Sequence, residues 1–218
     1  MELVGHVVSV QIGAVQPLAA DASQRTGYVK RPCAGPVRVT RLGLDGDEHA
    51  AVEVHGGPDR AVLAFCVSHY ELFRAEHPGH TFVAGAFAEN LTVDGLDETS
   101  VCIGDRFRVG TVELEVSLPR TPCGLLSLAT GIDGLFERVD ETGRSGWLHR
   151  VISEGVLSAG DEITRLAHPH SMWSVDRAAR VMARLRAGDR EAVADGLELA
   201  GIGALAERWR VRLRELAG

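Results

Sequence analysis

Short segments with strand-like patterns follow one another closely through the first three quarters of the chain, separated by turns rich in glycine, proline and aspartate. Residues 111–116 alternate apolar and polar side chains, as in a strand with one buried face. Residues 61–67 are continuously apolar, which suits a strand buried on both faces. Further strands are expected in residues 2–12, 37–40, 85–93, 106–111, 148–152 and 156–166. This succession predicts a mainly β (α+β) fold built on a β-barrel with a few short helices.

Two short helices are expected between these strands. Ser68 and Glu71 have the spacing of a capping box, so Ser68 is the expected N-cap of a helix that stops at residues 77–79. His69 is then an exposed residue of the first turn. A second helix is expected in residues 133–139, followed by a turn that places Arg144 and Trp147 over a cleft.

The pattern becomes helical from residue 174 onward. Five apolar residues recur on one face of the first helical segment: Val175, Ala178, Val181, Met182 and Leu185. Asp189 caps a second segment, and residues 204–216 form a third. His168 and His170 mark the boundary, so we predict a β-barrel domain in residues 1–168 and a small three-helix domain in residues 169–218.

Composition and charge narrow the classes of function. The chain has 218 residues and a net charge of −7, which gives no electrostatic basis for binding nucleic acid or an anionic membrane. The amino terminus lacks the pattern of a signal peptide, and no apolar run reaches the ~18 residues of a membrane span. The four cysteines have no CxxC spacing, which argues against a zinc ribbon or an iron–sulfur site. We therefore expect a cytoplasmic protein with reduced thiols.

The segment 117–124 carries the strongest chemical signal. Its two prolines end the preceding strand and stiffen the backbone, so Cys123 is expected on a rigid shelf beside Arg120. A nearby guanidinium favours the thiolate over the thiol. The alternative is that Cys123 is only a compact apolar residue in a tight connection.

Two glycine-rich segments and a single lysine are the other candidates. Residues 43–49 are dense in glycine and aspartate, and residues 55–60 read His-Gly-Gly-Pro-Asp-Arg. Both segments suit a backbone that approaches an anion closely, and both also suit ordinary turns. The chain has 22 arginines but only one lysine, Lys30, which is explained either by a need for a compact ammonium or by chance.

Together these segments resemble the MOSC-domain family, and within it the bacterial YiiM-like branch, whose three-helix appendage is similar to the carboxy-terminal stretch. The motifs occur in the order of that family: residues 30–32, 35–37, 43–47, 55–61, 87–91, 103–105 and 119–123. The resemblance implies a MOSC-type β-barrel that binds the molybdenum cofactor (molybdopterin), with Cys123 as the metal ligand. It also implies an oxidoreductase that removes oxygen from N-hydroxylated compounds such as hydroxylaminopurines.

The resemblance also assigns roles to individual residues. Cations and backbone N–H groups are expected to contact the phosphate of the cofactor: Lys30, His55, Gly56, Gly57, Arg60 and Arg120. Glu89, Asn90 and Asp105 are expected at the edge of the pterin, which needs both donors and acceptors. Besides Cys123, His55 and Asp47 are the predicted catalytic residues, as proton donors, with Asp45 as another candidate.

Electrons are expected from a separate reductase, because no segment looks able to bind a flavin, haem or iron–sulfur cluster. One alternative is a cofactor carrier or sulfur-handling module without turnover. Another is a zinc or iron site made by Asp45, Asp47, His49 and His55. The sequence leaves open a homodimer, and it leaves open whether four arginines of the last helix meet a partner or only solvent: Arg208, Arg210, Arg212 and Arg214.

Overall fold

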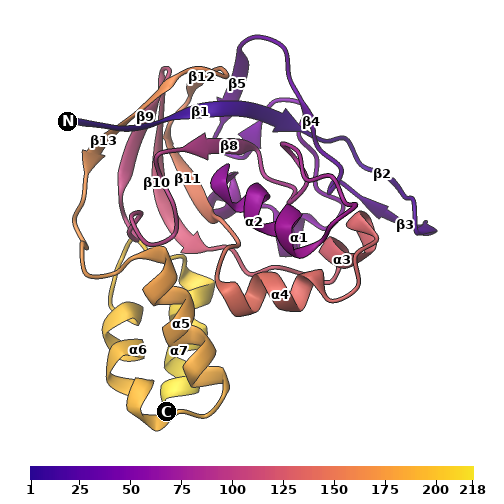
Figure 1. Ribbon diagram of the computed structural model, residues 1–218. Coiled ribbons are helices and arrows are strands. Elements are labelled where there is room, and N and C mark those ends of the chain that lie inside the picture. The colour runs from indigo at the N-terminus through magenta and orange to yellow at the C-terminus, as the bar shows by residue number, and fades with distance from the viewer.

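The computed structural model describes residues 1–218 and contains a closed barrel of seven strands (Figure 1). Their order around the barrel is β13-β9-β10-β11-β7-β8-β1, and β1 closes it by pairing with β13. All of these pairings are antiparallel except that between β7 and β8. The bounds are β1 (Glu2–Ile12), β7 (Val62–Cys66), β8 (Leu91–Asp94), β9 (Arg106–Val109), β10 (Val112–Pro119), β11 (Trp147–Ser153) and β13 (Glu162–Ala167). The predicted mainly β, barrel-based fold is confirmed.

Shorter elements surround the barrel. A three-stranded sheet joins β5 (Val37–Thr40), β6 (Gly43–Leu44) and β12 (Gly155–Leu157), and β4 (Arg31–Pro32) pairs with the end of β1. The hairpin of β2 (Gln16–Leu18) and β3 (Asp21–Thr26) projects away from the barrel in Figure 1. The helices of this part are α1 (Val52–His55), η1 (Pro58–Arg60, a 3₁₀ turn), α2 (Ser68–Glu76), α3 (Leu125–Thr130) and α4 (Leu135–Thr142). Their loops bring distant parts of the sequence to one side of the barrel.

The last part of the chain forms a helical unit at one end of the barrel (Figure 1). It consists of α5 (Val175–Arg186), η2 (Arg190–Ala192), α6 (Val193–Ala200) and α7 (Glu207–Ala217). All five apolar residues predicted on one face of α5 are buried, as the helical period requires. One cluster of 37 buried residues runs continuously from the barrel interior into this unit. The helical unit is thus packed onto the barrel, and the division at residue 168 stays a prediction.

The apolar strand β7 contributes to two cores. All five of its residues are buried, and Phe65 belongs to a second cluster that contains Phe73, Phe82 and Phe87. The rings of Phe65 and Phe87 stack with their centroids 4.4 Å apart. This cluster anchors α2 and the neighbouring loops on the barrel.

No helix in the structure combines the length and apolar character needed to cross a bilayer.

Several local expectations are wrong. Residues 85–90 form a turn rather than a strand, and β8 begins only at Leu91. The N-cap of α2 is Val67 and makes no capping bond, while the Ser68 hydroxyl lies 3.1 Å from the Cys66 sulfur. His69 is buried rather than exposed, and its Nε2 lies 2.7 Å from Glu98 Oε2. Trp147 is 1 % exposed and belongs to the core, not to the rim of a cleft.

Candidate functional site

A cavity of about 800 Å³ lies where the loop after β10 meets α1, η1 and α7. It is lined by six of the residues predicted for the site, which come from five separate segments: Lys30, His55, Arg60, Asn90, Arg120 and Cys123. Its volume is at the large end of the range of roughly 300–1,000 Å³ typical of ligand pockets. The structure therefore brings together most of the residues expected to bind a ligand.

Cys123 stands on a backbone that is held on both sides. Strand β10 ends at Pro119, and the next residue, Arg120, donates its N–H to the Gly146 carbonyl at 3.1 Å. The Ser145 hydroxyl donates to the Arg120 carbonyl at 2.7 Å, which fixes the start of the loop. Beyond it, the Cys123 carbonyl accepts a hydrogen bond of 2.9 Å from Leu126 in α3. The Cys123 side chain is partly exposed and lines the cavity, whereas Cys66 and Cys102 are buried.

Lys30, Asp47 and Asn90 form a buried polar group on one wall. The Lys30 ammonium is ion-paired with the Asp47 carboxylate, and the two side chains are 4 % and 2 % exposed. Asp47 also accepts hydrogen bonds from the Gly13 N–H at 2.8 Å and from the Asn90 amide at 2.9 Å. Burial lowers the pKa of Lys30, and the Asp47 charge opposes that shift. Asp47 itself does not line the cavity, so its structural role is to hold Lys30 and Asn90 in place.

A second part of the cavity lining is cationic. Burial lowers the pKa of His55, and the charges of Arg60, Arg120 and Arg208 lower it further. Burial and Arg208 likewise lower the pKa of Arg60. Four basic groups therefore lie close enough to repel one another: His55 of α1, Arg60 of η1, Arg120 of the Cys123 loop and Arg208 of α7. Such an arrangement favours binding of an anion among them.

Arg120 carries a buried charge that no carboxylate of the chain neutralises. It is 9 % exposed, no carboxylate lies within 4.0 Å of it, and its guanidinium donates to the Ser145 carbonyl at 3.3 Å. A buried charge without a partner is costly unless a ligand neutralises it. The nearby Tyr28 hydroxyl feels both Arg120 and Cys123, although burial dominates and raises the pKa of Tyr28. Arg120 and Cys123 thus face the same volume.

Five predicted site residues do not line the cavity: Asp47, Gly56, Gly57, Glu89 and Asp105. Glu89 is fully buried and holds the turn before β8, because it accepts hydrogen bonds from the backbone of Gly85 and Phe87. The Tyr70 and Thr92 hydroxyls also donate to this carboxylate. All of these donors are internal, so the structure does not present Glu89 to a pterin.

Asp105 is likewise engaged away from the cavity. It is fully buried and lies 2.7 Å from His168 Nδ1 and 3.6 Å from the Arg165 guanidinium. Cys102, Asp105 and His168 are the only group whose ligand atoms converge closely enough to hold a metal ion. The set of Asp45, Asp47, His49 and His55 that was considered for zinc or iron does not converge in this way. The geometry gives that alternative no support.

The comparisons with known proteins settle the family. A family model described as "MOSC domain" matches residues 51–164. The chain belongs to the MOSC-domain family. It is 41 % identical to "Protein YiiM" of Escherichia coli over 156 residues, which cover 71 % of this chain and 69 % of that protein. It is 36 % identical to a protein named "Reductase" from Gibberella moniliformis over 181 residues, which cover 82 % of this chain but 32 % of that longer protein.

A solved structure agrees with the sequence relatives. The crystal structure of YiiM from Geobacillus stearothermophilus superposes with a TM-score of 0.82 at 28 % identity, covering 98 % of this chain and all of that one. This coverage includes the helical unit as well as the barrel. The resemblance to the YiiM-like branch of the MOSC family is confirmed.

The structure adds cavity residues that sequence reasoning did not assign to the site. Tyr28 and His49 line this MOSC cavity, as do Arg186, Arg208 and Arg212 of the helical unit. His49 Nε2 lies 4.0 Å from Asp47, and burial lowers the pKa of this imidazole. From the sequence, the arginines of α7 are expected to contact a partner or solvent. These arginines are far from Cys123 in the sequence, so no local pattern could predict that they line the same cavity.

Proposed function

We propose that this MOSC protein binds the molybdenum cofactor, with Cys123 as the protein ligand of the metal, and reduces N-hydroxylated compounds to amines. Membership of the MOSC family supports a cofactor of this class, and the relative named "Reductase" supports the direction of the chemistry. Hydroxylaminopurines are a substrate class of this kind. A separate reductase supplies the electrons, and the protein acts in the cytoplasm.

The residues of the cavity fit such a cofactor. A thiolate is a soft ligand that suits a soft metal centre, and Cys123 places its sulfur on a backbone clamped by Ser145 and Gly146. The cofactor carries a phosphate, and Arg60 and Arg120 have no carboxylate partner that would compete with it. Asn90 lines the same wall as Lys30, but its amide donates to Asp47 and the Gln11 carbonyl and accepts from the Leu63 N–H, so its role is to shape that wall.

The observation that carries the proposal is the joint position of a partly exposed cysteine and a buried, unpaired arginine in one cavity. Either residue alone is common. Together they offer a ligand for a metal and a counter-charge for a phosphate within the same volume, which is the pair of contacts that a phosphorylated metal cofactor requires.

In the proposed reaction the N–O bond of the substrate breaks, two electrons arrive from the reductase, two protons are taken up, and amine and water leave. When bound, the molybdenum cofactor supplies the two-electron oxygen-transfer chemistry. Burial and the nearby arginines lower the pKa of His55 and so favour its neutral imidazole, whose two ring nitrogens can relay a proton from solvent to the substrate. Asp47 stays bound to Lys30 and Asn90, so His55 is the better candidate for this role.

Replacement of Cys123 by serine tests the proposal. Protein from a molybdenum-competent host is analysed for molybdenum and for amine formation from a hydroxylaminopurine with an artificial electron donor. Cys123→Ser is expected to lose at least a factor of ten in both measurements while keeping the wild-type circular dichroism spectrum. Cys33→Ser removes another free thiol outside the cavity and is the matched control.

These measurements also distinguish an enzyme from a cofactor carrier. Cofactor binding without amine formation in the wild type would favour a carrier without turnover. Full activity of Cys123→Ser with the cofactor bound would refute the role of this sulfur as metal ligand. Wild-type protein that holds neither molybdenum nor pterin would remove the proposal as a whole.

A further inference from the structure

Two groups of cations that line the cavity differ in burial. Lys30 and Arg120 are 8 % and 9 % exposed and form the inner group. Arg186, Arg208 and Arg212 belong to the helical unit, are exposed, and form the outer group at the mouth. Asp47 neutralises Lys30, and a single phosphate on the cofactor accounts for Arg120. Neither gives a reason for the outer group.

Arg208 is free to meet a ligand. It lies on α7 and has no carboxylate within 4.0 Å, although neighbouring arginines of the same helix are paired: Arg210 with Glu207 at 2.7 Å, and Arg212 with Glu215 at 3.1 Å. Arg212 is four residues further along the helix and therefore lies on the same face. Its pair with Glu215 is exposed on both sides, so it contributes little and is easily exchanged for a stronger partner.

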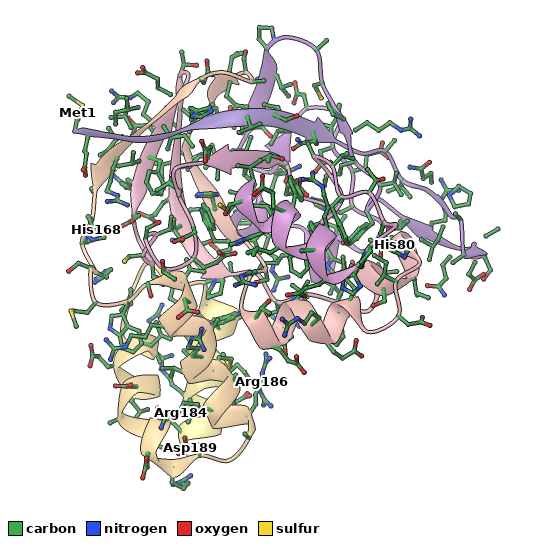
Figure 2. The ribbon with its side chains drawn as sticks, in the orientation of Figure 1. Met1, His80, His168, Arg184, Arg186 and Asp189 are labelled. Atoms are coloured by element: carbon green, nitrogen blue, oxygen red, sulfur yellow. The ribbon has the colours of Figure 1, made fainter.

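Arg208 also faces the reactive part of the cavity. Its charge contributes to the lowered pKa values of both His55 and Arg60. An anion held by Arg208 therefore lies at the mouth, on the side of the proposed proton relay. Figure 2 shows Arg186 on the flank of the helical unit toward α4, whereas Arg184 and Asp189, which bond at 2.7 Å, lie near its lower end.

The mouth also carries apolar surface that no protein group covers. Val54 of α1 and Val211 of α7 both line the cavity and are each 43 % exposed. A ligand that fits both features has a flat, weakly polar body and an anionic end. The volume of about 800 Å³ is large enough to hold such a ligand beside a cofactor.

We infer that the substrate is a phosphorylated nucleoside with an N-hydroxylated base, and that Arg208 and Arg212 bind its phosphate while Val54 and Val211 contact its sugar and base. Guanidinium groups suit this role because they bind phosphate oxygens through two parallel N–H bonds. This inference rests on the proposed function for the chemistry of the base. The phosphate-binding residues, however, are separate from Cys123 and can be tested separately.

Binding is tested by titrating the purified protein, as produced in the molybdenum-competent host, with cytidine 5′-monophosphate and with cytidine. The monophosphate is expected to bind at least about ten-fold more tightly, because hydrogen bonds to charged groups are the strong ones. The double variant Arg208→Ala/Arg212→Ala should lose this preference. Arg190→Ala removes an exposed arginine of the same unit that does not line the cavity and should keep it.

Turnover is tested with N4-hydroxycytidine and its 5′-monophosphate, using an artificial electron donor. The ratio of the two kcat/KM values should favour the monophosphate about ten-fold in the wild type and approach one in the double variant. Equal binding of cytidine and its monophosphate, or an unchanged preference in the double variant, would overturn the inference. A similar loss for both substrates would also overturn it and would indicate an electron-donor surface instead.

Failure of the proposed function gives a different pattern. It would appear as absent molybdenum and no amine from either substrate, while the binding titration still decides whether Arg208 and Arg212 hold a phosphate.

Discussion

Lys30, the only lysine of the chain, is ion-paired with Asp47, and the two side chains are only 4 % and 2 % exposed. The amide of Asn90 and the backbone N–H of Gly13 complete the shell of the carboxylate. The pair joins the wall of the cavity to the segment 43–49 beneath it. A compact ammonium fits this closed space, which gives a physical reason for a lysine in a chain that otherwise uses arginine.

Removing one member of this pair should destabilise the fold strongly. Lys30→Met or Asp47→Leu leaves the other charge buried and unpaired, so each is expected to lower the free energy of unfolding by about 3–5 kcal/mol. The double variant should be much less than additive, because it leaves no uncompensated charge. Urea unfolding of the four proteins measures the coupling.

The exposed pair Arg180–Asp176 is the matched control, with an Nε–Oδ2 distance of 2.8 Å. Its removal should cost about 0.5 kcal/mol or less. If the single variants of Lys30 and Asp47 are no worse than this control, the pair does not stabilise the wall of the cavity.

Gly146, whose carbonyl holds the backbone of Arg120, is a glycine whose replacement should harm the site. Its φ is +83°, and a Cβ atom would lie 2.2 Å from the Ala64 carbonyl oxygen in β7. Gly146→Ala combines a left-handed backbone, worth about 1–2 kcal/mol, with a forced shift of a barrel strand, worth about 1–3 kcal/mol. We expect a loss of about 3 kcal/mol in thermal or urea unfolding.

Gly160 provides the comparison for this prediction. Its φ is +90°, yet a Cβ atom there would meet nothing within 4 Å. Gly160→Ala should therefore cost only the backbone contribution of about 1–2 kcal/mol. Equal losses in the two variants would show that the contact with Ala64 is relieved without cost.

His149 should make stability depend on pH. It is buried between Trp147 and Val62, and burial lowers the pKa of His149 to about 4. The unfolded chain has a histidine pKa of about 6.5 and so binds more protons between these two values. The stabilisation is full above pH 6.5 and is lost as the pH falls toward 4.

The expected loss is about 2–3 kcal/mol between pH 7 and pH 4.5. The measurement compares the free energy of unfolding of wild type with that of His149→Gln. The difference between the two proteins should shrink by this loss as the pH falls from 7 to 4.5. The exposed His80, seen at the surface in Figure 2, is the control, and His80→Gln should leave the pH dependence unchanged. A constant difference between wild type and His149→Gln would contradict the prediction.

Local patterns in the sequence predicted much of the framework. The strand expected in residues 2–12 is β1, with the same bounds, and the apolar face of α5 is buried as predicted. Both results follow from periods of two and 3.6 residues, which each segment carries within itself. The capping-box prediction at Ser68 was wrong because tertiary contacts decided the start of that helix, with Ser68 meeting Cys66 and His69 meeting Glu98.

The sequence by itself determined most of the segments that become strands and helices, the stiffened loop that carries Cys123, and the family to which the chain belongs. Only the tertiary structure decided that Glu89 and Asp105 turn inward, and that Arg208 reaches the side of His55 from the other end of the chain. The physical reason is that the spacing of apolar residues within a single segment decides which of its faces is buried. The pairing of charges across a cavity depends on how the barrel closes and where the helical unit packs against it.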